Sequence, residues 1–420
     1  MNDIVIAVVG TFDTKSEEYQ YLIDRLSSIR FSSMNVKVLT IDVSTRDTAL
    51  LHADYGIQDI CSLADADIET LTHADRADAI AVIMRGASSL ILELFRRGSI
   101  HGMISIGGSG GTTIATHIMR QLPVGFPKVM ITTKACSSNM PDFIGSKDLI
   151  VINSIVDVSG TNSIISKVYD EGAGAVAGAA MIYASRKRNA DRNETPSRPK
   201  IAVSMYGITT PCVTHAVKYL ESKGYEPIVF HANGAGGKAM KTLISEGMFA
   251  GVLDVTTAEA AAEALGSDSA SAGPDRLDAA VIAGLPQVLS VGGVDVIGIR
   301  VEELDSKFAG HTPYCHNDKP DMIRTTPRDG IRIGEFMCKS LNNSYAPCAV
   351  FLPLRSVSSL DEEGGLTHDD EARRLLYETI NRCASSAVHV KEMDCDINDP
   401  AFAEAMAACL VQYLQSGKEV

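Results

Sequence analysis

The chain alternates between short apolar runs rich in β-branched residues and longer segments with helical periodicity. In the first half, the apolar runs lie at residues 4–9, 36–42, 102–106, 128–133 and 149–152. The clearest helical segment is residues 75–97, in which apolar side chains recur about every 3.6 residues and form one stripe. Strands that alternate with helices favour a parallel sheet covered by helices on its faces.

The second half repeats this pattern. Its predicted strands are residues 201–204, 227–230, 252–255, 279–283 and 349–352, and its predicted helices are residues 212–223, 238–246, 369–385 and 399–414. The polar run 186–200 lacks apolar periodicity and separates the two halves, so we place a linker there. We therefore predict an α/β protein of two Rossmann-like, doubly wound parallel-sheet domains, residues 1–190 and 200–420.

The composition narrows the class of function. Of the 420 residues, 45% are hydrophobic, and the formal net charge of -14 repels phosphate backbones, so we expect no nucleic-acid partner. The nine cysteines are scattered without a C-x-x-C pair, the first residues lack the features of a signal peptide, and no apolar run reaches about 18 residues. We therefore expect a cytoplasmic protein that contacts no membrane and binds a small molecule.

The first predicted strand is followed by Gly10-Thr11-Phe12-Asp13-Thr14-Lys15. Thr14 and Glu17 have the spacing of a capping box, which predicts a helix that begins near Lys15. A glycine turn at a helix N-terminus exposes N–H groups to an anion, Lys15 adds a positive charge, and Asp13 is a candidate magnesium ligand. An ordinary capped turn would produce the same pattern, so this segment alone leaves both interpretations open.

The strand that ends at residue 106 is followed by Gly107-Gly108-Ser109-Gly110-Gly111-Thr112. So many glycines allow several backbone N–H groups to point into one concavity, and Ser109 and Thr112 can add hydroxyl donors, so we interpret the segment as a phosphate-binding loop. A flexible turn is the alternative. The segment differs from a P-loop, because no lysine follows the glycines, and from the dinucleotide motif, because Thr113 replaces the third glycine.

Other candidate residues of this site come from neighbouring segments. Asp42 closes the second predicted strand, where a carboxylate can accept hydrogen bonds from ribose hydroxyls. Thr133 and Lys134 lie at the end of the fourth predicted strand, and Lys134 can balance phosphate charge. Arg85-Gly86 lies within the otherwise apolar helix predicted at 75–97, and Arg85 is either a functional arginine or a surface arginine whose stem covers apolar neighbours. Taken together, these segments predict a nucleotide site.

The second half carries the candidate catalytic residues. His231 opens the segment His231-Ala232-Asn233-Gly234-Ala235-Gly236-Gly237-Lys238, which is compatible with an anion, and His231 is a candidate general base. Ala239 replaces the magnesium-binding Ser or Thr of a Walker motif. His316 and Arg324 are candidates for an anion or substrate pocket in a long polar segment. His311 and Cys315 with His316 invite a zinc interpretation, although neighbouring residues rarely point the same way.

The order of these motifs is similar to that of a known family. GTFDTK, ISIGGSGGTT, YGITTPCV, FHANGAGGKAM, HNDKPDMIRTTP and FLPLRSVSSLD follow one another across nearly the whole chain. They resemble the ATP-binding domain family typified by the tomato mosaic virus resistance protein, whose bacterial and fungal members were long catalogued as an uncharacterised protein family. The resemblance implies two Rossmann-like domains, ATP bound at Gly10–Lys15 and Gly107–Thr112, and homodimers. Asn233, where the family usually has Thr, and Lys134 depart from its pattern.

Two functions remain open at this point. The first is an enzyme of small-molecule metabolism that uses ATP with Mg²⁺ or is regulated by ATP, because phosphoryl transfer needs positioning and charge neutralisation more than a nucleophile. The second is a non-catalytic, ATP-dependent regulatory protein that acts through protein contacts, as a plant member of the family acts on a viral replication protein. Turnover of ATP distinguishes the two.

Overall fold

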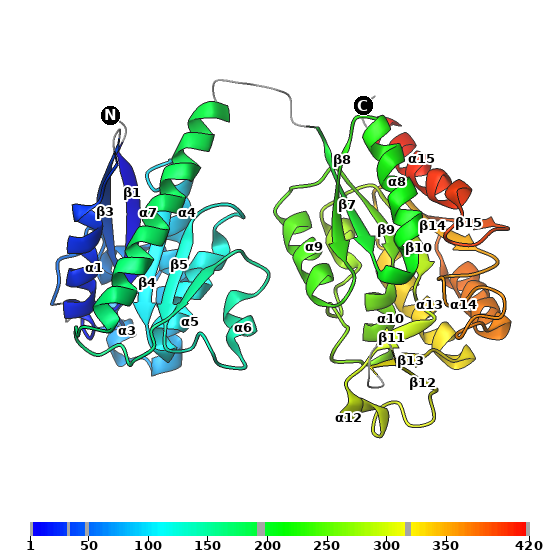
Figure 1. Ribbon diagram of the computed structural model, residues 1–420, viewed down its shortest axis with the longest axis horizontal. Coiled ribbons are helices and arrows are strands. Elements are labelled where there is room, and N and C mark those ends of the chain that lie inside the picture. The colour runs from blue at the N-terminus through cyan, green and yellow to red at the C-terminus, as the bar shows by residue number, and fades with distance from the viewer. Residues whose placement is uncertain (1–2, 32–33, 47–49, 191–197, 316–320, 417–420) are drawn as a thin grey trace. The chain divides into compact units, whose positions relative to one another are not determined.

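A computed structural model describes residues 3–31, 34–46, 50–190, 198–315 and 321–416. The chain divides into two compact units, Met1–Thr195 and Pro196–Val420, each with its own sheet (Figure 1). The last helix of the first unit, α7 (Ile165–Ala190), continues into the polar run predicted as a linker, so the first part of that run is helical. None of the described helices has the length and apolar content that a bilayer-spanning segment requires.

The first unit is built on a sheet in the order β2-β3-β1-β4-β5-β6. The bounds are β1 Ile4–Gly10, β2 Arg30–Phe31, β3 Met34–Asp42, β4 Gly102–Gly107, β5 Lys128–Thr132 and β6 Ile150–Asn153. All neighbours pair in parallel except β2, which is antiparallel to β3. Because β1 lies between β3 and β4, the strand order reverses beside β1, and this switch point is where open α/β sheets bind ligands.

Helices cover both faces of this sheet because alternate residues of each strand point to opposite sides. Ile4, Ile6 and Val8 pack on one face with α1 (Ser16–Ser28) and α7. Ala7 and Val9 pack on the other face with α2 (Ile57–Leu63), α4 (Arg76–Arg96) and α5 (Ser109–Gln121). The short helices α3 (Ile68–His73) and α6 (Met140–Ile144) complete the unit. The predicted doubly wound arrangement is confirmed.

The second unit has a parallel sheet in the order β15-β14-β10-β9-β7-β8. The bounds are β7 Lys200–Met205, β8 Glu226–His231, β9 Gly251–Thr256, β10 Gln287–Gly292, β14 Cys348–Pro353 and β15 Val388–Met393. A separate antiparallel sheet contains β11 Val296–Gly298, β12 Pro313–Tyr314 and β13 Met322–Arg324. The order of the main sheet reverses beside β7, which lies between β8 and β9.

Helices again cover both faces of the second sheet (Figure 1). One face packs on α8 (Thr210–Ser222) and α15 (Pro400–Ser416). The other packs on α10 (Ala258–Leu265), α13 (Pro327–Leu341) and α14 (Asp370–Cys383), and on α9 (Ala235–Ser245) and α11 (Asp278–Ile282). The remaining helical turns are η1 (Gly207–Thr209) and α12 (Val301–Leu304).

One predicted strand is wrong. Residues 279–282 form most of α11 and residue 283 follows its end, and the buried strand is the next apolar run, β10. A short apolar run has too few residues for its periodicity to distinguish a helical turn from a buried strand. β10 and the edge strand β15 were both missed by the sequence analysis.

Candidate functional site

A cavity of about 500 Å³ opens at the carboxyl edge of the first sheet. Its walls come from the segments after β1, β3 and β4 and from the start of α4. The polar lining residues are Thr11, Asp13, Thr14, Lys15, Thr45, Arg46, Arg76 and residues 107–111, and the apolar ones are Leu71, Ala74, Ala79, Ile80 and Ile114. The two glycine-containing segments singled out in the sequence therefore line one cavity.

Residues 107–111 form a helix start rather than a free loop. α5 begins at Ser109 and Gly108 is its N-cap, so the last two glycines belong to its first turn. The first N–H groups of a helix have no partner inside the helix and carry the positive end of its dipole. A Cβ atom on Gly110 would lie 3.4 Å from a guanidinium nitrogen of Arg76, which places this arginine at the helix start. The N-terminus of α5 thus supplies free N–H groups, and the positive charge of Arg76 lies beside them.

Thr112 has a structural role instead of the predicted phosphate contact. Its side chain is fully buried. Its hydroxyl donates to the carbonyl oxygen of Gly108 at 2.7 Å and lies 2.6 Å from the hydroxyl of Thr132 at the end of β5. These bonds fix the start of α5 to the sheet, whereas Ser109 lines the cavity.

Phe12 and Asp42 also serve the framework. Phe12 is fully buried, with its ring centroid 5.1 Å from that of Tyr19. Asp42 is 2% exposed, and its Oδ1 accepts hydrogen bonds from the Phe12 N–H and the Ser44 N–H, both at 3.0 Å. Burial raises the pKa of Asp42, and the bonds from Ser44 and Phe12 oppose this rise. Asp42 therefore anchors the loop after β1, which corrects its predicted contact with ribose.

The loop after β1 presents Asp13 and Lys15 to the cavity. Asp13 is half-buried, and its Oδ1 accepts a hydrogen bond from the Ser44 hydroxyl at 3.0 Å. The Lys15 ammonium donates to the carbonyl oxygen of Val158 and lies 3.9 Å from the carboxylate of Glu18. Asp13 is thus oriented by its neighbour, whereas part of the hydrogen-bonding capacity of Lys15 is already used inside the unit.

The predicted capping box is absent from the start of α1. The helix begins at Ser16, and its N-cap residue makes no side-chain cap bond. The Thr14 hydroxyl donates to that of Thr11 at 3.2 Å, and the Glu17 carboxylate accepts from the Thr161 hydroxyl at 3.0 Å. The spacing of Thr14 and Glu17 fits the motif, but tertiary contacts take both side chains elsewhere.

Tyr19 holds the ends of β1 and β4 together, although the sequence analysis did not single it out. Its buried hydroxyl lies 3.2 Å from the carbonyl oxygen of Val9 and 3.2 Å from the hydroxyl of Ser105, and it accepts from the Ile106 N–H at 3.0 Å. Burial raises the pKa of Tyr19 to about 12. A Cβ atom on Gly10 would lie 1.9 Å from this ring, so packing already requires a glycine there.

Two cations of the cavity, Arg46 and Arg76, were missed by the sequence analysis. Both are exposed; Arg46 follows β3 and Arg76 is the first residue of α4. The predicted Arg85 is exposed farther along α4 and lies outside the lining. A Cβ atom on Gly86 would lie 2.0 Å from the carbonyl oxygen of Ile60 in α2, so this glycine permits helix packing. The structure does not bring Arg85 and Gly86 to the cavity.

Thr133 and Lys134 follow β5 outside the lining of the cavity. The Thr133 hydroxyl would lie 4.0 Å from a Cβ atom on Gly108, which places this exposed residue near the start of α5. The Lys134 N–H donates to the Thr132 hydroxyl at 2.9 Å in a turn. These residues border the site without forming its walls.

The glycine segment of the second unit is filled by a side chain of the protein itself. The N–H groups of Gly234 and Gly237, at the start of α9, donate to Oε1 of Glu259 at 2.6 and 2.9 Å. Glu259 is 1% exposed and lies in the first turn of α10. A Cβ atom on Gly237 would lie 2.1 Å from its Oε2. The anion that the sequence predicted at this segment is therefore an internal carboxylate.

A buried ion cluster continues from Glu259. Arg276 donates from Nε to Glu259 at 2.7 Å and from its two terminal nitrogens to Asp254 at 2.8 and 3.0 Å. Burial alone lowers the pKa of Arg276, but the two carboxylates raise it above its usual value. The cluster carries two negative charges against one positive charge, and the N-terminus of α9 stabilises the excess.

The candidate catalytic residues of the second unit have separate surroundings. His231 ends β8 and is exposed, with its ring centroid 5.4 Å from that of Tyr206. Arg324 ends β13 and forms an ion pair with Asp369 at 3.0 Å. His316 lies outside the described residues. Of the two residues predicted to form an anion pocket, only Arg324 is described, and its positive charge is already paired with Asp369.

The zinc interpretation finds no support in the described ranges. His311 lies 2.9 Å through Nε2 from the carboxylate of Asp329 in α13. Cys315 is exposed. Within those ranges, no group of three or more His, Cys, Asp or Glu side chains is placed to hold a metal ion.

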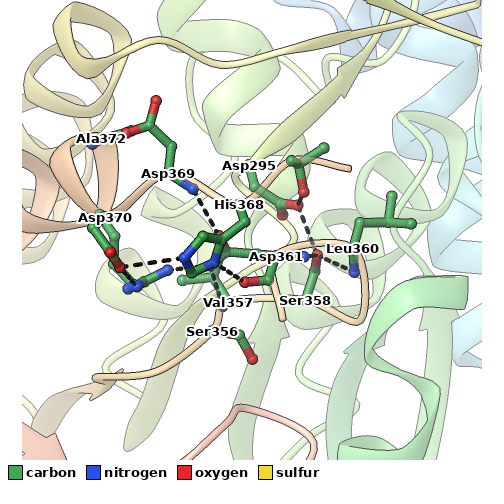
Figure 2. Close-up of polar contacts among 12 residues, drawn as sticks. Asp295, Ser356, Val357, Ser358, Leu360, Asp361, His368, Asp369, Asp370 and Ala372 are labelled. Carbon is green, nitrogen blue, oxygen red and sulfur yellow. Dashed lines mark hydrogen bonds and ion pairs between the residues drawn. The ribbon is translucent and has the colours of Figure 1, made fainter. Parts of the chain in front are cut away.

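Figure 2 shows a polar network in the second unit around Asp295 and Asp361. Oδ2 of the buried Asp295 accepts hydrogen bonds from the hydroxyls of Ser358 at 2.7 Å and Thr367 at 2.6 Å. Its Oδ1 has no hydrogen-bond partner among the residues that the structure describes. Burial raises the pKa of Asp295 to about 6, the hydroxyl bonds oppose the rise, and the charge of Asp361 adds to it. Asp361 itself pairs with Arg373 at 2.8 Å.

Comparisons with known proteins follow the same two-part organisation. Residues 4–185 match the N-terminal domain of the Uncharacterised protein family (UPF0261), and residues 198–414 match its C-terminal domain. A UPF0261 protein of Clostridium tetani is 36% identical over 413 residues, which cover 98% of this chain and 99% of that protein. The ToMV resistance protein Tm-1(GCR237) of Solanum lycopersicum is 33% identical over 432 residues, which cover 98% of this chain and 56% of the tomato protein.

Solved structures are similar only at a distance. UDP-N-acetylglucosamine 2-epimerase from Rickettsia bellii has 10% sequence identity and a TM-score of 0.24, with 69% of this chain and 78% of that chain covered. A likeness this distant supports no conclusion about function. Both domains match in order, and the clostridial relative matches over nearly its whole length. The chain therefore belongs to the uncharacterised protein family UPF0261.

Proposed function

We propose that the first unit binds ATP in its cavity and that the protein is an enzyme of small-molecule metabolism that uses ATP or is regulated by it. One observation carries the proposal: the two glycine segments meet at a cavity of about 500 Å³ where the strand order reverses beside β1. In open α/β sheets this crevice is where nucleotides bind. The family resemblance, which implies ATP at the same two segments, supports the same assignment.

The lining of the cavity combines the two kinds of surface that a nucleotide needs. The first turn of α5 offers N–H groups and the positive end of a helix dipole, and Arg46 and Arg76 add charge. Leu71, Ile80 and Ile114 provide apolar surface for a base. Phosphate groups would therefore lie at the start of α5, and the base against the apolar residues.

Asp13 is the residue that would hold a magnesium ion with the nucleotide. Its half-buried carboxylate lines the cavity, and the Ser44 hydroxyl orients it at 3.0 Å. Magnesium in nucleotide sites is usually bound through one or two carboxylates together with phosphate oxygens, so this donor set fits. The ion would supply neutralisation of phosphate charge.

Calorimetry on two arginine variants tests the site. Arg76→Ala removes a cation beside Gly110, and because a charge-assisted hydrogen bond contributes about 1.5–3 kcal/mol, we expect ATP affinity to fall roughly 10- to 100-fold. Arg85→Ala is the matched control, because Arg85 is also exposed on α4 but lies outside the lining. Equal ATP affinities in the wild type and the Arg76 variant would refute the site.

Turnover separates the enzyme from a regulatory protein that acts through protein contacts. The tomato proteins named for resistance and for susceptibility are both 33% identical to this chain, so the similarity gives no preference to an antiviral contact. If the protein with ATP and magnesium forms no ADP or AMP with a panel of sugar acids and keto acids, while ATP raises its melting temperature, the regulatory function replaces the enzyme. Light scattering with and without ATP measures the dimer that the family resemblance implies.

A further inference from the structure

A small cavity of the second unit lies beside the polar network that Figure 2 shows. Its volume is about 20 Å³, whereas one water molecule needs roughly 10–15 Å³, so the cavity admits a single water-sized particle. Side chains of α13 and α14 form one wall, and the segments that follow β10, β13 and β14 form the other. The cavity therefore lies at the carboxyl edge of the second sheet, where open α/β sheets bind ligands.

Asp295 lines this cavity and has one oxygen without a partner in the described chain. The residue is 7% exposed, and its Oδ2 accepts hydrogen bonds from the hydroxyls of Ser358 at 2.7 Å and Thr367 at 2.6 Å. Its buried Oδ1 accepts none from the residues that the structure describes. A buried polar atom without a partner is costly, and it marks a position where a molecule or ion from solution can bind. The cavity next to Asp295 offers the space for that partner.

The charges of the lining determine the sign of the partner. The described lining contains two other carboxylates, and each is paired with an arginine. Asp361 pairs with Arg373 at 2.8 Å. Asp369 pairs with Arg324 at 3.0 Å. Asp295 has no paired cation among the described residues, so one negative charge lacks a counterion, and the partner that compensates it is a cation.

The other oxygens of the lining suit a cation with a single charge. Thr325 and Thr367 both line the cavity, and each gives its only hydroxyl proton elsewhere. Thr325 donates to the carbonyl oxygen of Val294 at 3.0 Å, and Thr367 donates to Oδ2 of Asp295. Their hydroxyl oxygens therefore keep lone pairs for a cation. Divalent cations prefer several carboxylates, and the described residues contain no group of three acidic, His or Cys side chains placed to hold one.

We propose that this cavity binds one small monovalent cation, such as K⁺, Na⁺ or NH₄⁺, with Oδ1 of Asp295 and the hydroxyl oxygens of Thr325 and Thr367 as its ligands. Such an ion supplies the positive charge that the network lacks and links the segments that follow β10, β13 and β14. The site is independent of the proposed ATP site, because its lining shares no residue with the cavity of the first unit.

Melting temperatures of the full chain in matched salts test the proposal. The chlorides of K⁺, Na⁺ and NH₄⁺ are compared with tetramethylammonium chloride, which has the same charge but is too large for the cavity and leaves Asp295 without a counterion. The assay is run near pH 8, where Asp295 is ionised because burial raises its pKa only to about 6. At about 100 mM, at least one of the three cations should raise the melting temperature by about 3 °C or more over tetramethylammonium. Equal melting temperatures in all four salts would overturn the proposal.

Two variants assign the response to this cavity. Asp295→Asn keeps the size of the side chain but removes its charge and should lose the cation-specific rise, whereas Asp305→Asn alters an exposed carboxylate of the same unit and should keep it. Thr325→Val removes one oxygen ligand at similar volume, so several-fold more cation should be needed for half of the rise. Unaltered circular dichroism in tetramethylammonium chloride shows that each variant is folded. A rise of equal size in the wild type and the Asp295 variant would place the cation elsewhere and refute the site.

Discussion

Replacing Asp295 with Asn should change how the stability of the second unit depends on pH. Asp295 is buried, its Oδ2 accepts two hydroxyl hydrogen bonds, and its Oδ1 has no partner in the described part of the chain. Asp361 adds a negative charge nearby, which Arg373 partly balances. Asn keeps an oxygen that can accept the same two bonds but cannot ionise, so the variant isolates the effect of the charge.

The sign follows from the direction of the pKa change. Burial raises the pKa of Asp295 from 3.8 to about 6 in the folded protein, so the folded state binds this proton more tightly than the unfolded state. The stabilisation from the protonated form is complete below about pH 4 and is lost as the pH rises through about 6. With about 1.4 kcal/mol for each pH unit between the two pKa values, the loss approaches roughly 3 kcal/mol above pH 7.

Urea unfolding followed by circular dichroism between pH 4 and 8 measures this loss. The unfolding free energy of the wild type should fall relative to that of Asp295→Asn as the pH rises, with most of the change between about pH 4 and 6 and little above pH 7. Asp305→Asn, an exposed carboxylate of the same unit, serves as the control and should follow the wild type. Parallel pH profiles of the wild type and the Asp295 variant would refute the reasoning, whatever their offset.

Three further outcomes test the framework. Gly237→Ala should lower the unfolding free energy by about 2 kcal/mol or more, because the new Cβ atom would lie 2.1 Å from the Glu259 carboxylate. The control Gly174→Ala in α7 has open space around the new Cβ atom and should raise the unfolding free energy by up to about 1 kcal/mol. Thermal unfolding compares the two variants. Arg276→Met leaves two carboxylates buried without their cation and should cost about 3–5 kcal/mol in urea unfolding. Tyr19→Phe should cost about 1–3 kcal/mol and also weaken ATP binding in calorimetry, because it releases the strand ends beside the cavity; an unchanged affinity would contradict its positioning role.

The fold was largely predictable because parallel strands carry a strong local signal. Buried on both faces, such strands become continuous β-branched runs, and the predicted range 4–9 falls on β1 (Ile4–Gly10), just as 102–106 falls on β4 (Gly102–Gly107). The run 279–283 failed because a single helical turn can bury the same residues. β10 and β15 have six residues each, as β4 has, and were nevertheless missed, so the length of a strand did not decide which strands were found.

The site was predictable only where the chain leaves a strand. The segments after β1 and β4 were found because glycines mark both. Arg76 was missed because it lies far upstream in the sequence, yet a signal was present: a helix that leads directly into a parallel strand starts at the carboxyl edge of the sheet. Gly86 and Gly237 were misleading for the opposite reason. Each is required because a neighbouring carbonyl or carboxylate oxygen leaves no room for a Cβ atom, and in the sequence such a glycine cannot be distinguished from one that makes room for a ligand.

Because the Glu259 carboxylate occupies the N–H groups at the start of α9, the stability of the two units depends differently on molecules in solution. The first unit presents a helix N-terminus to a cavity, so any molecule that binds there adds to its stability in proportion to the logarithm of that molecule's concentration. In the second unit, the N–H groups at the start of α9 bind the Glu259 carboxylate as soon as the chain folds. Because this partner belongs to the same chain, its effective concentration is fixed. Under the proposed function, the stability of the first unit therefore depends on the concentration of free ATP, whereas that of this part of the second unit does not.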